Sequence, residues 1–321
     1  MKKITALLLV LIISISVFSV NASAFGGYAH WYMGVKKGDS YGNTKSDEVK
    51  LAYASGCLLA DIGKYGLDLT KAPESDSYEF TRKIYSVSRD LNTRSRCMAY
   101  GWRDHYVQDR KGSLALTNPP ATTLSSAGWV DEYLRDVWKP IDFPIQDKEL
   151  GEIYIGYTLI RRTYEQYGVI LDKNSDVDRE IKNLLGKIDF QIGLNVVDWK
   201  PAQEEAIKSE LHRTVNLCTG ITAGVPQEIR STSLSENVSG IDKSFSEYQA
   251  SIKKTRTDVV MNSITDDELS EITKYIHFEK DYISEDEAIL KIRKTDEEAY
   301  NAAVKDLIEY KIDNYSELVA A

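Results

Sequence analysis

The stretch "MAYGWRDHYVQD", Met98–Asp109, predicts a helix that carries His105 and Asp109 four residues apart. Side chains at this spacing lie one above the other on a single helix face. Such a pair can present an imidazole nitrogen and a carboxylate oxygen to one metal ion. Solvated surface pairs have the same spacing, so the pair by itself leaves both interpretations open.

Helical patterns continue on both sides of this stretch, and no alternating run of useful length indicates a strand. The segment 46–63 begins with Ser46 as a capping residue and then becomes apolar. The other predicted helices span 77–91, 95–109, 128–138, 147–168, 175–199 and 201–225. Loops are predicted at 111–128 and at the polar segment 225–243. We predict an all-α fold, a multi-helix bundle whose charged tail, 245–321, adds further amphipathic helices.

The first 24 residues have the composition of a cleaved secretory signal peptide. Two lysines precede an apolar run, and Ala22 and Ala24 offer the small residues that a signal peptidase needs. The run contains serines and is short for a transmembrane anchor. We expect a secreted protein that starts at Phe25, with a helical domain over 25–225. The C-terminal helical region, 226–321, is either a separate module or the last helices of that domain.

The chain carries 40 Lys and Arg residues against 49 Asp and Glu residues, a formal net charge of −9. This balance argues against general binding to polyanions, because a phosphate backbone is bound mainly through cationic side chains. We therefore expect no nucleic-acid partner, while a small-molecule or lipid substrate stays open. Cys57, Cys97 and Cys218 are too few for a disulfide framework. They are small buried helix residues, or the first two form one bridge.

Four histidines occur, and two of them have other candidate ligands for company. His212 and His277 lack a second ligand at metal spacing and are interpreted as surface or structural residues. His30 lies five residues after the predicted amino terminus, in "FGGYAH", where two glycines let the chain end fold back. Asp61 ends the apolar helix "YASGCLLAD", where a buried acid is costly without a partner, although it could also cap the next segment.

The order of these segments resembles the bacterial zinc-dependent phospholipase C family and its phospholipase C/D-domain relatives. It also resembles the single-strand-specific nucleases that share the same all-helical fold. The matching segments are "FGGYAH", "LLADIG", "SYEFTRKI", "AYGWRDHYVQD" and "GWVDEYLRD", which together span roughly a third of the chain. The resemblance implies that the amino nitrogen and carbonyl oxygen of Phe25 bind a metal ion together with His30. It further implies that Asp61, His105 and Asp109 are ligands, with Asp109 bridging two ions.

The chain lacks several histidines that are typical of this family. The family has a histidine before "SYEF", another shortly after the His-x3-Asp helix, and a later His-x3-Glu or His-x3-Asp pair, and none of these occurs here. Asp76 stands near the first of these positions, and Asp131 and Glu132 stand near the last, as further ligands or as neighbours of ligands. The resemblance therefore implies two Zn²⁺ ions that share Asp109, while a third site is lost.

Hydrolysis of a phosphodiester needs a deprotonated water and neutralisation of charge on the phosphate oxygens, and a pair of cations supplies both. The resemblance suggests Asp61 as the catalytic base. We expect a secreted, metal-dependent phosphodiesterase of phospholipase C type that acts on a phospholipid or another small phosphodiester, with peripheral membrane contact left open. The alternatives are a weakened or inactive binding or structural protein on the same scaffold, which the lost histidines favour, and a less favoured single-strand nuclease.

Overall fold

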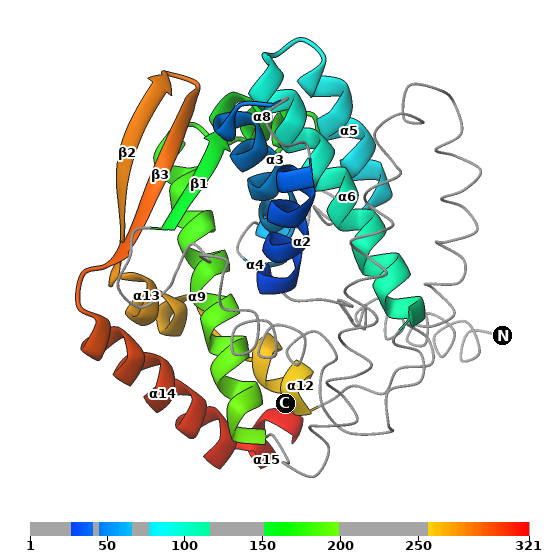
Figure 1. The fold of residues 1–321 in the computed structure, drawn as a ribbon. Coiled ribbons are helices and arrows are strands. Elements are labelled where there is room, and N and C mark those ends of the chain that lie inside the picture. Colours follow the sequence, from blue (N-terminus) through cyan, green and yellow to red (C-terminus); the bar gives the residue numbers. More distant parts are fainter. Residues whose placement is uncertain (1–26, 41–44, 66–76, 116–150, 199–255, 321) are drawn as a thin grey trace, which may run out of the picture.

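The computed structural model describes residues 27–40, 45–65, 77–115, 151–198 and 256–320 (Figure 1). These residues form a mostly helical fold with one small antiparallel sheet. The predicted signal peptide and the predicted helices at 128–138 and 201–225 lie outside them. Within the described residues, no helix combines the length and the apolar character that crossing a membrane requires.

The first part of the described chain is a set of packed helices. They are α2 (Gly27–Ser40), α3 (Asp47–Leu59), α4 (Ile62–Tyr65), α5 (Tyr78–Ser88) and α6 (Thr93–Ala115). Ser77 caps α5, because its hydroxyl accepts a hydrogen bond from the Phe80 amide at 3.2 Å. Ser46 precedes α3 in the extended conformation of a capping residue, but its side chain makes no capping hydrogen bond.

Most of the predicted helices in this part are confirmed, with two differences. The segment 46–63, predicted as one helix, forms α3 and α4 with a break after Leu59, and Asp61 lies in that break. α6 continues to Ala115, so the predicted loop does not begin at Lys111. The break matters for the site, because it turns Asp61 out of the regular helix at the end of α3.

α3 and α6 cross closely, and a glycine on each helix makes the crossing feasible. A Cβ atom on Gly56 would lie 2.0 Å from a backbone oxygen of α6, and one on Gly101 would lie 2.0 Å from the carbonyl oxygen of Tyr53. Helix backbone cannot move aside as the end of a flexible side chain can, so only glycine fits at both positions. The crossing places the carbonyl oxygen of Cys57 2.7 Å from Nδ1 of His105.

The later part of the described chain combines helices with a three-stranded sheet. Its elements are β1 (Gly151–Gly156), α8 (Tyr157–Glu165), α9 (Asn174–Asp198), α12 (Arg256–Asn262), α13 (Asp266–Thr273), β2 (Ile276–Ser284), β3 (Glu287–Lys294), α14 (Glu297–Asp313) and α15 (Tyr315–Ala320). The strand order is β1-β3-β2, and both pairings are antiparallel. The C-terminal hairpin of β2 and β3 therefore shares one sheet with β1, which precedes α8 (Figure 1).

The sheet corrects part of the all-α prediction, although the helical class of the fold is confirmed. The segment 147–168, predicted as one helix, contains β1 before α8, and the tail predicted as helical contains the hairpin. In β3 the alternate residues Ala288, Leu290 and Ile292 are buried, the period of two that a strand requires. Ile289 between them is itself apolar, so the sequence shows a short apolar run in place of a clear alternation, and the two glycines that bound β1 give only a weak sign of strand ends.

The long helix α9 confirms the helix predicted at 175–199 and organises the later part of the fold. It packs against α4, α8, α12, α13 and α14, which lie around it in Figure 1. Its buried residues Val177, Ile181, Leu184 and Leu185 follow helical spacing and belong to the same hydrophobic core as the N-terminal helices. The first helices, α9 and the hairpin therefore share one core.

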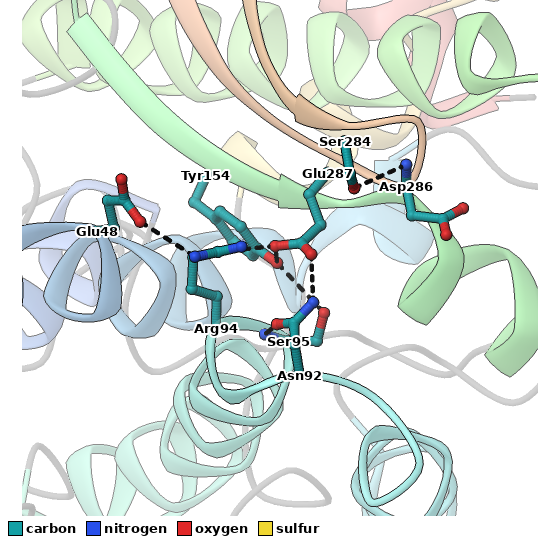
Figure 2. A network of polar contacts seen from close by, with 8 residues as sticks. All are labelled: Glu48, Asn92, Arg94, Ser95, Tyr154, Ser284, Asp286 and Glu287. Carbon is teal, nitrogen blue, oxygen red and sulfur yellow. Dashed lines mark hydrogen bonds and ion pairs between the residues drawn. The ribbon is translucent and has the colours of Figure 1, made fainter.

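A polar network around Glu287 connects the sheet to the start of α6 (Figure 2). The Glu287 carboxylate accepts hydrogen bonds from Arg94 Nε and from the Tyr154 hydroxyl, each at 2.8 Å, and from the Asn92 amide. Arg94 also pairs with Glu48 of α3 at 3.2 Å. These contacts satisfy a buried carboxylate with donors from α6 and β1, as burial of a charge requires.

The two cysteines within the described residues are free thiols. Cys57 is buried and Cys97 is half-buried, which agrees with the interpretation of both as small helix residues. The alternative of a bridge between them is therefore wrong. Cys218 lies outside the described residues.

Candidate metal centre

Four predicted ligands meet in the interior, where three separate segments come together. His30 lies on α2, Asp61 lies in the break between α3 and α4, and His105 and Asp109 lie on α6. All four are buried, with at most 2% of each residue exposed. The interpretation of His105 and Asp109 as a solvated surface pair is therefore wrong.

The ligand atoms of this group are close enough to share an ion. One nitrogen or oxygen each from His30, Asp61 and His105 lie within 4.8 Å of one another, so these three residues form a buried group that can hold a metal ion. Asp109 directs Oδ1 to Nε2 of His30 at 3.0 Å and Oδ2 to Nε2 of His105 at 3.4 Å. Its two oxygens therefore face two different imidazoles, as expected of a bridging carboxylate.

Both imidazoles are held from their outer side through Nδ1. Nδ1 of His105 donates to the carbonyl oxygen of Cys57, and Nδ1 of His30 donates to Oε1 of Gln108, each at 2.7 Å. A histidine that donates from Nδ1 keeps the lone pair on Nε2, the arrangement found in metal-bound histidines. Nε2 of His105 is buried and has no hydrogen-bond partner, 3.5 Å from Oδ1 of Asp61. A buried ring nitrogen that faces two carboxylates without a hydrogen bond fits a metal ion.

The electrostatics of the centre favour added positive charge. Burial alone would lower the pKa of His105, but the carboxylates of Asp61 and Asp109 outweigh it and raise the pKa to about 10. Burial would raise the pKa of Asp109, yet His30 and His105 hold it well below its usual range. The two rings are stacked with centroids 3.7 Å apart, which disfavours two adjacent imidazolium charges. A divalent cation would balance the charge of the two carboxylates.

The structure does not describe the other predicted site residues. Phe25, Asp76, Asp131 and Glu132 lie outside the described residues, and so does His212. His277 lies on β2 with an exposed side chain, which agrees with its interpretation as a residue without a metal-binding role.

Two residues of the centre had little or no signal in the sequence. Gln108 is an ordinary polar residue on an aromatic helix, and Cys57 contributes to His105 through its backbone carbonyl, which any residue could supply. A helical wheel of α6 places Gln108 beside His105 and Asp109, and that proximity was the one available clue.

Comparison of the chain with protein-family models, with curated proteins and with solved structures finds no match. The metal centre is therefore assigned from its own geometry, and the resemblance to phospholipase C stays a prediction from the order of residues.

Proposed function

We propose that this protein is a secreted, zinc-dependent phosphodiesterase of phospholipase C type that acts on a phospholipid-like substrate. The observation that carries the proposal is the convergence of His30, Asp61, His105 and Asp109 in one buried group, with Asp109 facing both imidazoles. Two imidazoles and two carboxylates form the mixed nitrogen and oxygen donor set that suits Zn²⁺.

The residues of the centre divide into three roles in this proposal. His30 and His105 would hold metal through Nε2, because Nδ1 of each is engaged on the outer side. Asp109 would be the carboxylate that the two sites share, because its two oxygens face the two imidazoles. Bound Zn²⁺ supplies Lewis-acid stabilisation of the phosphate and lowers the pKa of a coordinated water toward about 7. Asp61, whose Oδ1 lies 3.5 Å from Nε2 of His105, would accept the proton of the attacking water.

The charge of the chain supports a small substrate over a nucleic acid. The net charge of −9 means that acidic residues outnumber basic ones. Neutralisation of a polynucleotide backbone needs an excess of basic residues, so the charge disfavours the single-strand nuclease alternative. A single phosphodiester requires charge only at the reacting group, and bound cations provide it locally.

A second candidate function is a binding or structural protein that keeps the metal for stability. The burial of all four ligands favours this alternative, because a hydrolytic ion needs an open coordination position that substrate can reach. Structural metal ions instead sit in closed sites and add their binding free energy to folding.

Metal analysis and hydrolysis assays on the mature protein distinguish these functions. We expect two Zn²⁺ per chain by mass spectrometry and hydrolysis of a chromogenic phosphocholine ester and of phosphatidylcholine vesicles, with no cleavage of single-stranded DNA. Asp109→Asn should lose metal and at least about 1000-fold in activity, since both ions share this residue. Asp47→Asn, at an exposed position of α3, is the matched control and should change neither quantity.

Each outcome of these assays has a defined meaning. Zinc without hydrolysis of any phosphodiester would support the structural alternative and contradict the enzyme. Absence of zinc from protein purified without chelators would contradict both functions. Cleavage of single-stranded DNA in preference to the lipid substrates would replace the proposed substrate class.

A further inference from the structure

We infer that Gln108 is a positioning residue of the metal centre, which fixes His30 in the tautomer that can bind a metal ion, and that the thiol of Cys57 fixes the orientation of the Gln108 amide. The inference depends on the metal centre of the proposed function and is independent of its substrate.

The contact between Gln108 and His30 determines which imidazole nitrogen carries the proton. Oε1 of Gln108 lies 2.7 Å from Nδ1 of His30, and Gln108 is 1% exposed, so water does not compete for this bond. An amide oxygen only accepts, and Nδ1 must therefore donate. The lone pair then stays on Nε2, which faces Oδ1 of Asp109 at 3.0 Å.

The opposite end of the amide contacts Cys57. Nε2 of Gln108 donates to Sγ of Cys57 at 4.0 Å, a weak but buried hydrogen bond. If the amide were reversed, its NH₂ group would face Nδ1 of His30, and that nitrogen would have to accept. Nε2 of His30 would then carry the proton and donate it to Asp109, which excludes a metal ion from that nitrogen. The sulfur contact therefore favours the productive orientation.

One residue of α3 thus acts on both imidazoles. Cys57 holds His105 directly through its carbonyl oxygen and holds His30 indirectly through Gln108. Gln108 also lies on the same helix as two of the ligands, His105 and Asp109, so a shift of α6 against α3 would disturb ligands and positioning residues together. Outer hydrogen bonds of this kind change metal affinity by about 10-fold to 100-fold when removed.

Two substitutions of Gln108 separate hydrogen bonding from packing. Gln108→Met keeps the length of the side chain and removes the acceptor, whereas Gln108→Glu keeps an acceptor for His30. We measure Zn²⁺ affinity by chelator competition, the visible spectrum of the Co²⁺-substituted protein, and the melting temperature of the metal-free protein. Gln108→Met should bind Zn²⁺ about 10-fold to 100-fold more weakly and alter the Co²⁺ spectrum, and Gln108→Glu should retain wild-type affinity within about threefold.

The same measurements give the results that would overturn the inference. Wild-type affinity in Gln108→Met would show that the amide does not position His30. Equal loss of affinity in both variants, accompanied by equal loss of stability in the metal-free protein, would show that Gln108 acts through packing alone.

A double-mutant cycle tests the contribution of the sulfur. Cys57→Ala removes the thiol but keeps the backbone carbonyl that holds His105, so it should weaken Zn²⁺ binding when Gln108 is present. In the Gln108→Met background the same change should have no further effect, because no amide remains to be oriented. Additive losses would contradict the connection between Cys57 and Gln108.

Failure of this inference is distinguishable from failure of the proposed function, because Zn²⁺ affinity is measured without substrate. A wild-type protein that binds Zn²⁺ and hydrolyses no phosphodiester would overturn the enzyme and leave the role of Gln108 intact. A wild-type protein that hydrolyses a phosphodiester, together with unchanged Zn²⁺ affinity in Gln108→Met, would support the enzyme and overturn the role of Gln108.

Discussion

Buried carboxylates occur in two regions of this molecule and are neutralised in different ways. In the region of α9 and the sheet, Asp178 accepts from the Tyr157 hydroxyl at 2.7 Å and pairs with Lys280. Asp189 accepts from the Tyr300 hydroxyl at 2.9 Å and faces Lys294 at 3.5 Å. Asp178, which is buried, and Asp189, which is half-buried, thus each have a phenol and a cation supplied by the protein itself.

In the region of α2, α3 and α6, two buried acids instead face histidines of the candidate metal centre. Asp61 and Asp109 face imidazole nitrogens, and Nε2 of His105 has no hydrogen-bond partner. Burial of acidic residues by itself therefore does not indicate a functional site. The distinguishing feature of the centre is that the ring nitrogens of two histidines converge on two carboxylates, a donor set that suits a metal ion.

Removal of metal should affect one of these regions and not the other. With metal at about 1000 times the dissociation constant, each bound ion stabilises the native state by about 4 kcal/mol, so a chelator should lower the unfolding free energy of the wild-type protein by at least this amount. Asp109→Asn should show no further loss on chelation. Asp178→Asn is the matched control, because it removes a buried acid of the other region.

Urea unfolding with and without chelator checks this expectation. Asp178→Asn should be less stable than wild type yet lose the same amount on chelation as the wild-type protein does. An equal response of Asp109→Asn and wild type to the chelator would contradict the assignment of the centre.

Glu287 provides a second test, because its charge balance is complete within the protein. Glu287→Gln replaces one acceptor oxygen with a donor that faces Arg94, Asn92 or Tyr154, which leaves at least one buried donor without an acceptor. We expect a loss of about 2 kcal/mol in unfolding free energy and no change in Zn²⁺ affinity. Glu285→Gln, at an exposed position before the same strand, should change neither. A parallel loss of Zn²⁺ affinity in Glu287→Gln would show that the two regions are coupled.

Much of the helical fold was predictable from the sequence, because α3, α5, α6 and α9 have apolar residues at helical spacing. The sheet was missed where short apolar runs lie among charged residues, and its pairing of β1 with β3 joins segments that are far apart in the chain. Pairing over such a distance leaves no local pattern. The requirement for Gly56 and Gly101 at the crossing of α3 and α6 was also not predictable. It depends on how closely the two helix backbones approach, which the local sequence does not indicate.

The ligands of the centre were predictable for a different reason. His30, Asp61, His105 and Asp109 are polar residues in apolar or aromatic segments, and such residues need partners when buried. The outer hydrogen bonds were not predictable, because the carbonyl of Cys57 carries no side-chain signature and Gln108 acquires its role only from the rotamer that reaches His30.

The smallest expected effect concerns an ion pair in the later region between a buried lysine and a half-buried glutamate. Lys311 of α14 donates to Glu268 of α13 at 2.8 Å. Burial alone would raise the pKa of Glu268, but the hydrogen bonds from Lys311 and Thr265 and the charge of Lys311 lower it below its usual value. A depressed carboxyl pKa stabilises the native state above the unfolded pKa of about 4.3 and loses this effect as pH falls through the folded pKa.

Glu268→Gln should therefore be less stable than wild type by about 1 kcal/mol at pH 6, and the difference should shrink toward pH 3. Thermal unfolding of both proteins across this range measures it. Glu271→Gln, on the same helix with an exposed lysine partner, is the matched control and should show a smaller difference at pH 6. A difference between wild type and Glu268→Gln that grows as pH falls would reverse the sign of the linkage. It would mean that the folded protein stabilises Glu268 in its protonated form. Lys311 would then not neutralise Glu268 as Lys280 and Lys294 neutralise Asp178 and Asp189.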